Sequence, residues 1–577
     1  MRKFSYVFVV VTILLVAGSL WACGQQNPTE PSKLSQVVEG MDDFYYFADD
    51  NSVLLIGPKD KALTSVTIPS CVTTISGGAF EDCTALQEVV FASKSKLKEV
   101  QTAAFKNCIA LKSISLPSSV KIVGNEVFSG CSSIESIDFN TKGLTDFGTL
   151  VFKNCSSLKS VVVPSQVSVT EKEFEGCASL SSVVLSEGIT SIGDKAFYGR
   201  AIKSLTLPSS LVSIGANAFY GNKLSGDIVF PDGLKTIGAR AFFGNEFSGI
   251  ILPTSVDFIG NSAFACGLNF NLEKITLPFI GNTKDGGRLT YVLGARDFSQ
   301  MKIRVLGGKL TAEMLVGLEN ATIEISKDVD VKAGSLDDTQ WFANQQDGIL
   351  YIGDVVYGYK GKAVSSLSIK EGTTKILDEA FLNYHKSFYS SSTQPYLRLY
   401  LPSTLSEMGK KNFFAVPLII VVSDENPVYK SEYYSLLSKD GKKLILSGLG
   451  GGVPGVETIC EYAGITLADI TSFTITIPNS VKYIERFAFL SSKVEFESGS
   501  NLISVGDYAL CFMGETSEST VLDLSALEKL ESIGKNAFGI GGAPSDILFD
   551  EFGINNPIGD YVSVVETVKL PKNLKEK

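Results

Sequence analysis

The segment Ile202-Lys-Ser-Leu-Thr-Leu-Pro208, followed by Ser213-Ile-Gly-Ala-Asn-Ala-Phe219, contains the pattern that decides the fold. Its first part has apolar residues at the first, fourth and sixth places, and the last two of these alternate as a β-strand requires. Proline then ends the strand because it lacks the N–H that would extend the hydrogen-bond ladder. We expect the glycine after isoleucine to adopt a positive φ at a corner. We expect Ala-Phe to point inward from a short helical or irregular turn.

The same unit recurs along the chain, and the phenylalanine that closes it marks each copy. Successive copies are 22 to 25 residues apart, at Phe80, Phe105, Phe128, Phe152, Phe174, Phe197, Phe219, Phe242 and Phe264. A unit of about 23 residues cannot bury its apolar side chains alone, so the copies must stack on one another. The 577 residues would ordinarily suggest several globular domains, but the repeat predicts a single one-dimensional core.

The repeat LxxIxLP…IGxxAFxxC resembles the leucine-rich repeats of bacterial surface proteins of the BspA-like type. The resemblance is strong over residues 63–278, and it returns in looser form at Thr374 to Phe381, Leu397 to Phe414, Phe473 to Phe489, and Leu530 to Phe538. It implies a β-rich leucine-rich repeat solenoid with short helical turns, built of right-handed stacked coils of about 23 residues. It also implies adhesion, to host extracellular-matrix proteins or to other bacteria.

The sequence suggests six segments along the chain. They are a lipoprotein signal peptide (1–22), a lipidated cysteine with a flexible tether (23–36), an N-terminal capping hairpin (37–62), tight repeats (63–278), an irregular insertion (279–362) and degenerate repeats with insertions (363–577). The cap is an aromatic run at 44–47, a turn at 49–51 and a strand at 53–56. Hairpin-like insertions are expected at 347–361 and 426–443. Because residues 279–362 depart from the pattern, a break into two solenoid blocks is an alternative.

The N-terminus has the features of an export signal. Arg2 and Lys3 precede an apolar stretch, 4–17, which is shorter than the roughly 20 residues of a membrane-spanning helix and fits a signal peptide. Leu20-Trp-Ala-Cys23 resembles the bacterial lipobox, which implies that Cys23 becomes lipidated. An ordinary cleaved signal with an incidental cysteine is the alternative. We therefore expect an exported bacterial lipoprotein of the outer membrane or cell surface, with the periplasmic face as the other possible location.

Five of the 10 cysteines occupy one place in the repeat, three residues after the closing phenylalanine: Cys83, Cys108, Cys131, Cys155 and Cys177. The next three copies have Arg200, Asn222 and Asn245 at this place. It matches the Asn/Cys place of leucine-rich repeats, and we predict buried thiols that contact backbone groups. A disulfide between stacked neighbours is an alternative, since adjacent strands lie about 4.8 Å apart. One cysteine per coil does not match the CxxC pairs of zinc sites.

The sequence contains few features that indicate catalysis, metal binding or nucleic-acid binding. A net charge of −11 argues against a nucleic-acid partner, and the single histidine, His385, excludes most Ser-His-Asp sites and multi-histidine zinc sites. No phosphate-binding loop, GxSxG elbow or HExxH helix occurs. We predict no enzyme activity, no cofactor and no metal. The alternative is an exported hydrolase, which would need two carboxylates held about 5 to 10 Å apart in a cleft.

A candidate interaction strip follows from the fifth residue of each LxxIxLP strand, which points away from the core. Stacked coils place these residues in one column: Thr67, Val90, Ser115, Asp138, Val162, Val184, Thr206, Val229, Ile251 and Thr276. We select Val162, Val184, Thr206, Val229 and Ile251 as a contact strip for a protein or glycan, because exposed apolar patches often mark interaction sites. Lysines accompany the strip at Lys112, Lys159 and Lys203. The β-propensity of valine and isoleucine is the alternative explanation.

Two functions follow as hypotheses. The first is an exported, lipid-anchored repeat protein that binds other macromolecules, as a cell-surface adhesin or interaction protein. The second is a glycan-binding or nutrient-capture surface lipoprotein, which would need an aromatic stacking platform. The best candidates for that platform are Tyr384, Phe388, Tyr389, Tyr396 and Tyr400. Packing of these side chains in loops and in the core is the alternative explanation.

Overall fold

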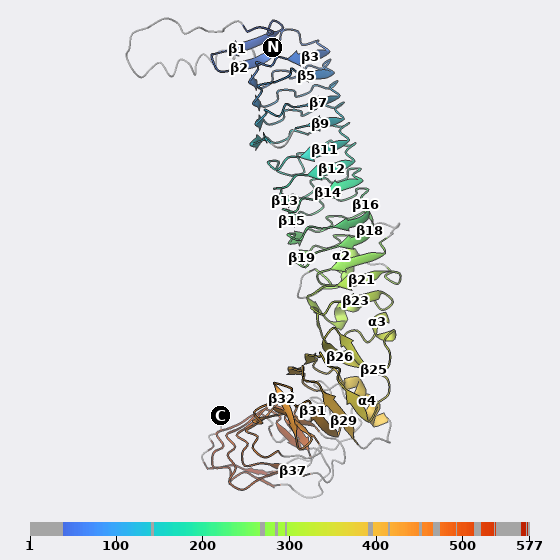
Figure 1. Ribbon diagram of the computed structural model, residues 1–577, viewed down its shortest axis with the longest axis vertical. Coiled ribbons are helices and arrows are strands. Elements are labelled where there is room, and N and C mark those ends of the chain that lie inside the picture. The colour runs from blue at the N-terminus through green and yellow to red at the C-terminus, as the bar shows by residue number, and fades with distance from the viewer. Residues whose placement is uncertain are drawn as a thin grey trace, which may run out of the picture. The chain divides into compact units, whose positions relative to one another are not determined.

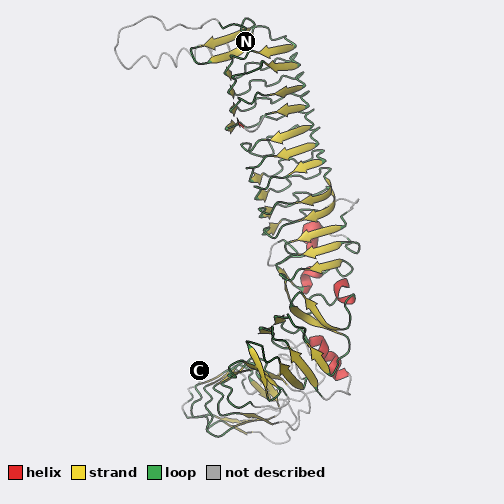
Figure 2. Ribbon diagram, viewed as in Figure 1, coloured by secondary structure: helices red, strands yellow, loops and turns green. Residues whose placement is uncertain are grey.

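The computed structural model describes most of the chain after residue 37. The described residues are 38–139, 143–265, 272–282, 287–294, 297–390, 396–413, 416–448, 453–465, 474–491, 493–512, 521–535, 537, 567–572 and 574. They form stacked coils of short strands (Figure 1), with few helices (Figure 2). The chain divides into two compact units, 1–208 and 209–577, which we describe separately. The predicted signal peptide, Cys23 and the tether lie outside the described residues.

The first unit begins with an antiparallel hairpin, β1 (Phe44–Ala48) and β2 (Val53–Pro58). The Asp49 carboxylate accepts hydrogen bonds from the backbone N–H groups of Asn51 and Ser52, at 2.8 and 2.7 Å. The predicted turn at 49–51 is therefore held by its own aspartate. β2 pairs in parallel with β4 (Thr74–Ile75), so the hairpin covers the edge of the first coil.

Each coil of the first unit contributes a longer strand to one parallel row, and most coils also contribute a shorter strand to a second row. One coil has only an isolated bridge there, between Val169 and Ile192. The longer strands form a seven-stranded sheet: β3 (Ser65–Ile68), β5 (Glu88–Phe91), β7 (Ser113–Ser115), β9 (Ser136–Asp138), β11 (Ser160–Val163), β12 (Ser182–Leu185) and β14 (Ser204–Thr206). The shorter strands continue from β2 through β4, β6 (Glu99–Val100), β8 (Ile122–Val123) and β10 (Asp146–Phe147). β13 (Ser191–Ile192) is the short strand of the last coil. The predicted solenoid is confirmed.

A ladder of phenylalanine rings fills the core. All nine closing phenylalanines, from Phe80 to Phe264, are fully buried. Phe80 stacks on Phe105 with ring centroids 5.0 Å apart and planes 3° apart, and Phe152 stacks on Phe174 at 5.2 Å and 8°. Offset stacking of this kind adds about 0.5 to 1.5 kcal/mol per pair beyond the burial of area. The inward direction of Ala-Phe is confirmed.

The repeated cysteines form a second ladder beside the rings. Cys108 Sγ donates a hydrogen bond to the Phe80 carbonyl at 3.2 Å, and the next three cysteines repeat this contact one coil further on. Burial raises the pKa of Cys83 to about 11 and of Cys177 to about 12, so both remain protonated thiols. All five cysteines are free. The prediction of buried structural thiols is confirmed.

Other side chains can replace the thiol because the buried backbone carbonyl needs only a hydrogen-bond donor. Arg200 Nη2 donates to the Phe174 carbonyl at 2.8 Å. Asn245 Nδ2 donates to the carbonyls of Phe219 and Phe242 at 2.9 and 2.8 Å. Cysteine, arginine and asparagine therefore satisfy the same buried backbone acceptor.

The expectation for the glycine after isoleucine was wrong. Gly238 and Gly260 do not have positive φ; the residues two places later, Arg240 and Ser262, do, at 54° each. A Cβ on Gly238 would lie 2.4 Å from the Ala216 nitrogen, and one on Gly260 would lie 2.3 Å from that of Ala239. These glycines are required because adjacent coils approach closely, which the sequence of one coil does not reveal.

One coil of the first unit contains a buried carboxylate where most others have a small apolar residue. Glu173 is 2% exposed, and its two oxygens accept the N–H groups of Leu150 and Val151 at 2.7 and 2.8 Å. In the preceding coil the corresponding N–H, that of Glu126, donates to the Thr149 carbonyl instead. Burial raises the pKa of Glu173, although the backbone donors lower it in part.

The second unit begins with the same two rows. Its longer strands are β16 (Ser225–Val229), β18 (Glu246–Ile251), β20 (Lys274–Leu277), β21 (Lys302–Val305) and β23 (Thr322–Ile325), which form one parallel sheet. Its shorter strands are β15 (Ser213–Ile214), β17 (Thr236–Ile237) and β19 (Phe258–Ile259), then β22 (Lys309–Leu310) and β24 (Asp330–Val331).

This result differs from the irregular insertion expected at 279–362. Ile275 pairs with Ile303, and Ile303 pairs with Ile323, so the sheet continues through this stretch. The strands keep their apolar alternation although the LP, IG and AF signals are lost. Short helices occupy the turns instead: α2 (Leu289–Leu293), η2 (Ala312–Leu315) and α3 (Gln340–Ala343).

Two antiparallel insertions follow in the second unit, at the places where hairpins were expected. The first is β25 (Gly348–Ile352) with β26 (Val355–Lys360), and β26 then pairs in parallel with β28 (Lys375–Ile376). The second is β32 (Tyr429–Glu432), β33 (Ser435–Ser438) and β34 (Lys443–Leu446), after which β34 pairs in parallel with β35 (Thr458–Ile459). Each insertion therefore re-enters the row of short strands.

The remaining strands complete the coils of the second unit. The longer row contains β27 (Ser366–Ser368), β29 (Leu397–Leu401) and β31 (Leu418–Val422), and separate pairs β37 (Thr474–Ile477) with β40 (Lys493–Phe496) and β43 (Val521–Asp523) with β45 (Thr567–Lys569). The shorter row contains β30 (Glu407–Met408), β38 (Tyr483–Ile484), β41 (Ser504–Val505) and β44 (Ser532–Ile533). A further sheet contains β36 (Gly464–Ile465), β39 (Phe489–Ser491) and β42 (Leu510–Phe512).

The core of these later coils is less regular. Phe381 stacks on Phe413 at 4.1 Å, whereas the expected Phe414 lies outside the described residues. Helix α4 (Leu382–Ser390) contains His385. No helix among the described residues is long and apolar enough to cross a membrane.

Candidate binding surfaces

The exposed strip is aligned in the first unit as the repeat predicted. Val162 pairs in register with Val184, and Val184 pairs with Thr206, across β11, β12 and β14. The two valines are 46% and 37% exposed, while the alternate residues Val161 and Val163 are buried. Beside them Lys159 forms a 2.7 Å ion pair with Glu135. This unit therefore presents a short apolar column on a rigid sheet face.

The second unit contains the other part of the strip. Val229 pairs with Ile251, which pairs with Thr276, and the two apolar residues are 63% and 38% exposed. Beyond Thr276 the column becomes charged, with Arg304 paired to Glu324. The strip is therefore described as two segments, one in each unit.

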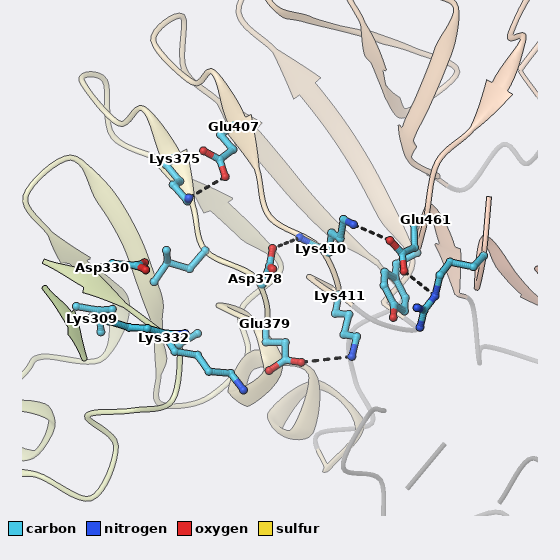
Figure 3. Close-up of a pocket in the computed structure, with 15 residues that line it drawn as sticks. Lys309, Asp330, Lys332, Lys375, Asp378, Glu379, Glu407, Lys410, Lys411 and Glu461 are labelled. Atoms are coloured by element: carbon cyan, nitrogen blue, oxygen red, sulfur yellow. Dashed lines mark hydrogen bonds and ion pairs between the residues drawn. The ribbon is translucent and has the colours of Figure 1, made fainter. Parts of the chain in front are cut away.

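A charged cleft of about 500 Å³ lies in the second unit (Figure 3). Lys375 pairs with Glu407 at 2.7 Å, and Glu461 lies between Lys410 and Arg486, at 2.6 and 3.0 Å. The hydrogen bonds that the two ammonium groups donate to these carboxylates raise the pKa of Lys375 and of Lys410. Most of the charge that lines the cleft is therefore neutralised within it.

The insertions explain why a cleft forms here. Among the described residues the row of short strands is interrupted at both insertions. β24 is hydrogen-bonded only to β22, and β30 ends the sheet that contains the first insertion, so β24 does not pair with β28 and β30 does not pair with β35. A second cavity, of about 210 Å³, is lined by Met408, Tyr429, Leu446 and Cys460 and lies at the second of these interruptions. The sequence indicated hairpins, but it did not indicate that they would separate the coils.

The other carboxylates of the cleft also have partners. Asp378 accepts the backbone N–H of Lys410 at 2.7 Å, and Glu379 lies 3.6 Å from the Lys411 ammonium. No group of three or more His, Cys, Asp or Glu side chains in the described part of the chain could hold a metal ion.

The residues of the candidate aromatic platform around α4 differ in exposure. Tyr384 is fully buried, its hydroxyl donates to the Val364 carbonyl, and its ring contacts Tyr359 at 5.0 Å. Phe388 is also buried, and the Tyr389 side chain lies outside the description. Tyr400 is 38% exposed, and Tyr396 is half-buried. Tyr384 and Phe388 therefore do not belong to a platform, and the alternative of core packing holds for both because α4 turns them inward.

The stacked coils, the buried phenylalanine ladder and the Cys/Asn place define a leucine-rich repeat solenoid. The family described as BspA type leucine rich repeat region matches residues 59–173, 167–284 and 457–551, which is more than half of the chain. This chain belongs to that family. Such repeat proteins are typically non-enzymatic and associated with bacterial surfaces.

Several solved structures are similar to the chain. A leucine-rich repeat protein of T. pallidum is 28% identical over 31% of this chain and 86% of its own, with a TM-score of 0.28. One from Bacteroides ovatus is 20% identical over 65% and 93%, with a TM-score of 0.32. A leucine rich cell surface protein from Faecalibacterium prausnitzii is 16% identical over 81% and 96%, with a TM-score of 0.25. No curated protein matches the chain.

Proposed function

We propose that this chain is an exported, lipid-anchored protein that binds other macromolecules at the cell surface, as an adhesin or interaction protein. The observation that carries the proposal is the exposed apolar column Val162–Val184, with its counterpart Val229–Ile251. Lipid attachment at Cys23 is supported by the lipobox resemblance in the sequence. Family membership supports protein binding.

The column suits a protein partner for a physical reason. Its side chains are fixed by the strands, so binding orders little that is mobile and costs little conformational entropy. Fully burying one such side chain contributes about 1.5 to 3 kcal/mol, and these side chains have already lost part of their exposure. Each of the two segments can therefore contribute binding energy without a pocket.

The binding hypothesis can be tested by replacing Val184, Val229 and Ile251 with serine. We expect at least a tenfold weaker interaction with those host extracellular-matrix proteins that the unmodified chain binds on a panel. Val90→Ser is the matched control, because Val90 is 45% exposed at the same strand place but lies outside the strip. Unchanged binding by the triple variant would show that the strip is only structural.

Anchoring and location need a separate experiment. Metabolic labelling with a fatty acid should mark the unmodified protein and leave Cys23→Ala unlabelled. Protease treatment of intact cells should remove the protein from the surface. A protein that stays fully protected in intact cells and is cut only after lysis would contradict surface display.

A further inference from the structure

The turn between β32 and β33 has an unusual sequence. It consists of Tyr433 and Tyr434, which follow the paired residues Glu432 and Ser435, and both have positive φ, at 48° and 62°. Two-residue hairpin loops with this backbone strongly favour Asn-Gly. A bulky residue in the left-handed region is strained because its Cβ crowds the following carbonyl oxygen.

Burial does not compensate for this strain. Tyr433 and Tyr434 are 59% and 55% exposed, so each presents more than half of its surface to solvent. Two tyrosines therefore occupy strained positions at which smaller residues would fold more easily. Strain of this kind is typical of functional sites.

The hairpin tip is held against the neighbouring sheet. The Ile420 N–H donates to the Tyr434 carbonyl at 3.1 Å, and the Val422 N–H donates to Ser431 Oγ at 3.2 Å. A Cβ on Gly448 would lie 2.1 Å from the same Tyr434 carbonyl oxygen, so the chain packs closely behind the turn. The tyrosines are carried by a fixed support beside β31, and β32 lies close to β31 in Figure 1.

The adjoining sheet face adds further aromatic and cationic groups. Tyr400 on β29 pairs with Val421 on β31, and the two are 38% and 41% exposed. Two residues before Tyr400, Arg398 is exposed and lies near the Tyr396 ring, at 5.9 Å from its centroid. We call Tyr396, Arg398, Tyr400, Val421, Tyr433 and Tyr434 the tyrosine patch.

The charge of the patch limits its possible ligands. Hydrogen bonds with Tyr396 and Tyr400 raise the pKa of Arg398, and among the described residues it forms no ion pair with a carboxylate. The chain as a whole has a net charge of −11. An exposed guanidinium surrounded by phenol groups is therefore available to a carboxylate, which it can bind with two parallel hydrogen bonds.

We propose that the tyrosine patch binds an acidic glycan. Sugar rings present flat C–H faces that pack on exposed phenol rings, their hydroxyl groups can hydrogen-bond the tyrosine hydroxyls, and a uronic or sialic acid carboxylate can pair with Arg398. Neither cavity described above includes any of these side chains, so the patch presents open phenol faces rather than a pocket. Adjacent strands are about 4.8 Å apart, so one oligosaccharide can span β29, β31 and the hairpin tip. This site goes beyond the protein-binding strip and does not depend on it.

The test uses the full chain and a variant designed to keep the fold. Tyr433→Asn combined with Tyr434→Gly installs the preferred turn sequence, so its melting temperature should equal or exceed that of the unmodified protein. An oligogalacturonate and a sialylated oligosaccharide serve as probes. We expect the double variant to bind the better of these at least tenfold more weakly.

The charge requirement is tested with a matched ligand pair. The unmodified protein should prefer free oligogalacturonate to its methyl ester, which has no carboxylate charge, and Arg398→Gln should remove this preference. Absence of binding to both acidic probes, or equal binding by the double variant, would overturn the proposal. So would binding of a protein, but no glycan, through the two tyrosines. The strip variant in Val184, Val229 and Ile251 should bind the glycan normally, so the two hypotheses fail independently.

Discussion

The coils of residues 63–208 and those of residues 348–512 use one repeat for different purposes. In the first region every coil pairs with the next along the row of longer strands, and the closing rings and the cysteines line up from coil to coil. In the second region two antiparallel insertions interrupt the row of short strands, and a charged cleft and a strained aromatic turn lie beside them. Regular stacking produces a flat face, whereas interruptions produce local sites.

The ring ladder shows the same contrast. In the second region Gly464 occupies the place of the closing phenylalanine, and the Phe489 ring fills the space, because a Cβ on Gly464 would lie 2.0 Å from that ring. In this coil a neighbouring ring takes the volume that the closing ring would fill. The first region has no such replacement among its fully buried rings.

The largest expected effect comes from breaking the ladder in the first region. Phe128→Ala leaves a cavity between stacked coils and should lower the free energy of unfolding by about 3 to 5 kcal/mol. Denaturant-induced unfolding measures this loss. Phe128→Leu keeps most of the volume and should cost clearly less. A loss below about 1 kcal/mol for the alanine variant would show that the first region repacks as the second does.

The next effect concerns close approach between coils. Gly238→Ala places a Cβ 2.4 Å from the Ala216 nitrogen and should destabilise the protein by about 1 to 3 kcal/mol through overpacking. Arg240→Gly, two residues later at a φ of 54°, should be near neutral, because glycine relieves the strained φ but costs chain entropy. If Arg240→Gly lowered the melting temperature more than Gly238→Ala, the role assigned here to Gly238, close approach between coils, would be contradicted.

The next prediction concerns Glu173, the buried carboxylate that interrupts the small apolar residues of the first region. Glu173→Ala leaves the N–H groups of Leu150 and Val151 without their acceptor, at a cost of about 1 to 3 kcal/mol. Because the folded-state pKa is raised above its ordinary value of 4.5, the stabilisation by this side chain is full below that pH. It declines as pH rises through the folded-state pKa.

Unfolding curves of both proteins between pH 4 and 7 would check this sign. The difference between wild type and Glu173→Ala should shrink as pH increases. A difference that grows with pH would mean that the ionised carboxylate is the favoured form in the folded protein.

The smallest effect belongs to the charged cleft of the second region. Glu461 is 15% exposed, but Lys410 and Arg486 are about half exposed, so solvent screens both pairs. Glu461→Gln should cost less than about 1 kcal/mol at low salt, and this cost should shrink in salt. The isolated pair Lys153–Glu175 in the first region provides the matched control, and Glu175→Gln should cost less still.

Much of the fold followed from the repeat, because each coil contains its own strand, turn and buried ring. The period predicted the stacking, and the cysteine place predicted buried thiols that meet backbone carbonyls. The strip residues were predicted to align because the fifth strand residue alternates with buried neighbours. The hairpins at 347–361 and 426–443 also agree with expectation. All of these are local patterns that neighbouring coils repeat.

The wrong expectations and the alternatives left open have a common cause. The glycine role at Gly238 depends on the backbone of another coil, and the burial of Tyr384 depends on how α4 packs. The continuation of the sheet at Ile303 and Ile323 depends on pairing between strands whose flanking motifs had disappeared. In each case the deciding contact joins residues that the pattern of a single coil does not connect.

The sequence by itself determined that this chain stacks as a leucine-rich repeat solenoid, because a short unit with too little core must bury its apolar face on copies of itself. Only the tertiary structure decided where the surface departs from the flat face of the repeat. Clefts, ion-pair networks and the tyrosine patch arise from the spacing and register between coils, and those distances depend on which backbones can approach and which insertions keep them apart.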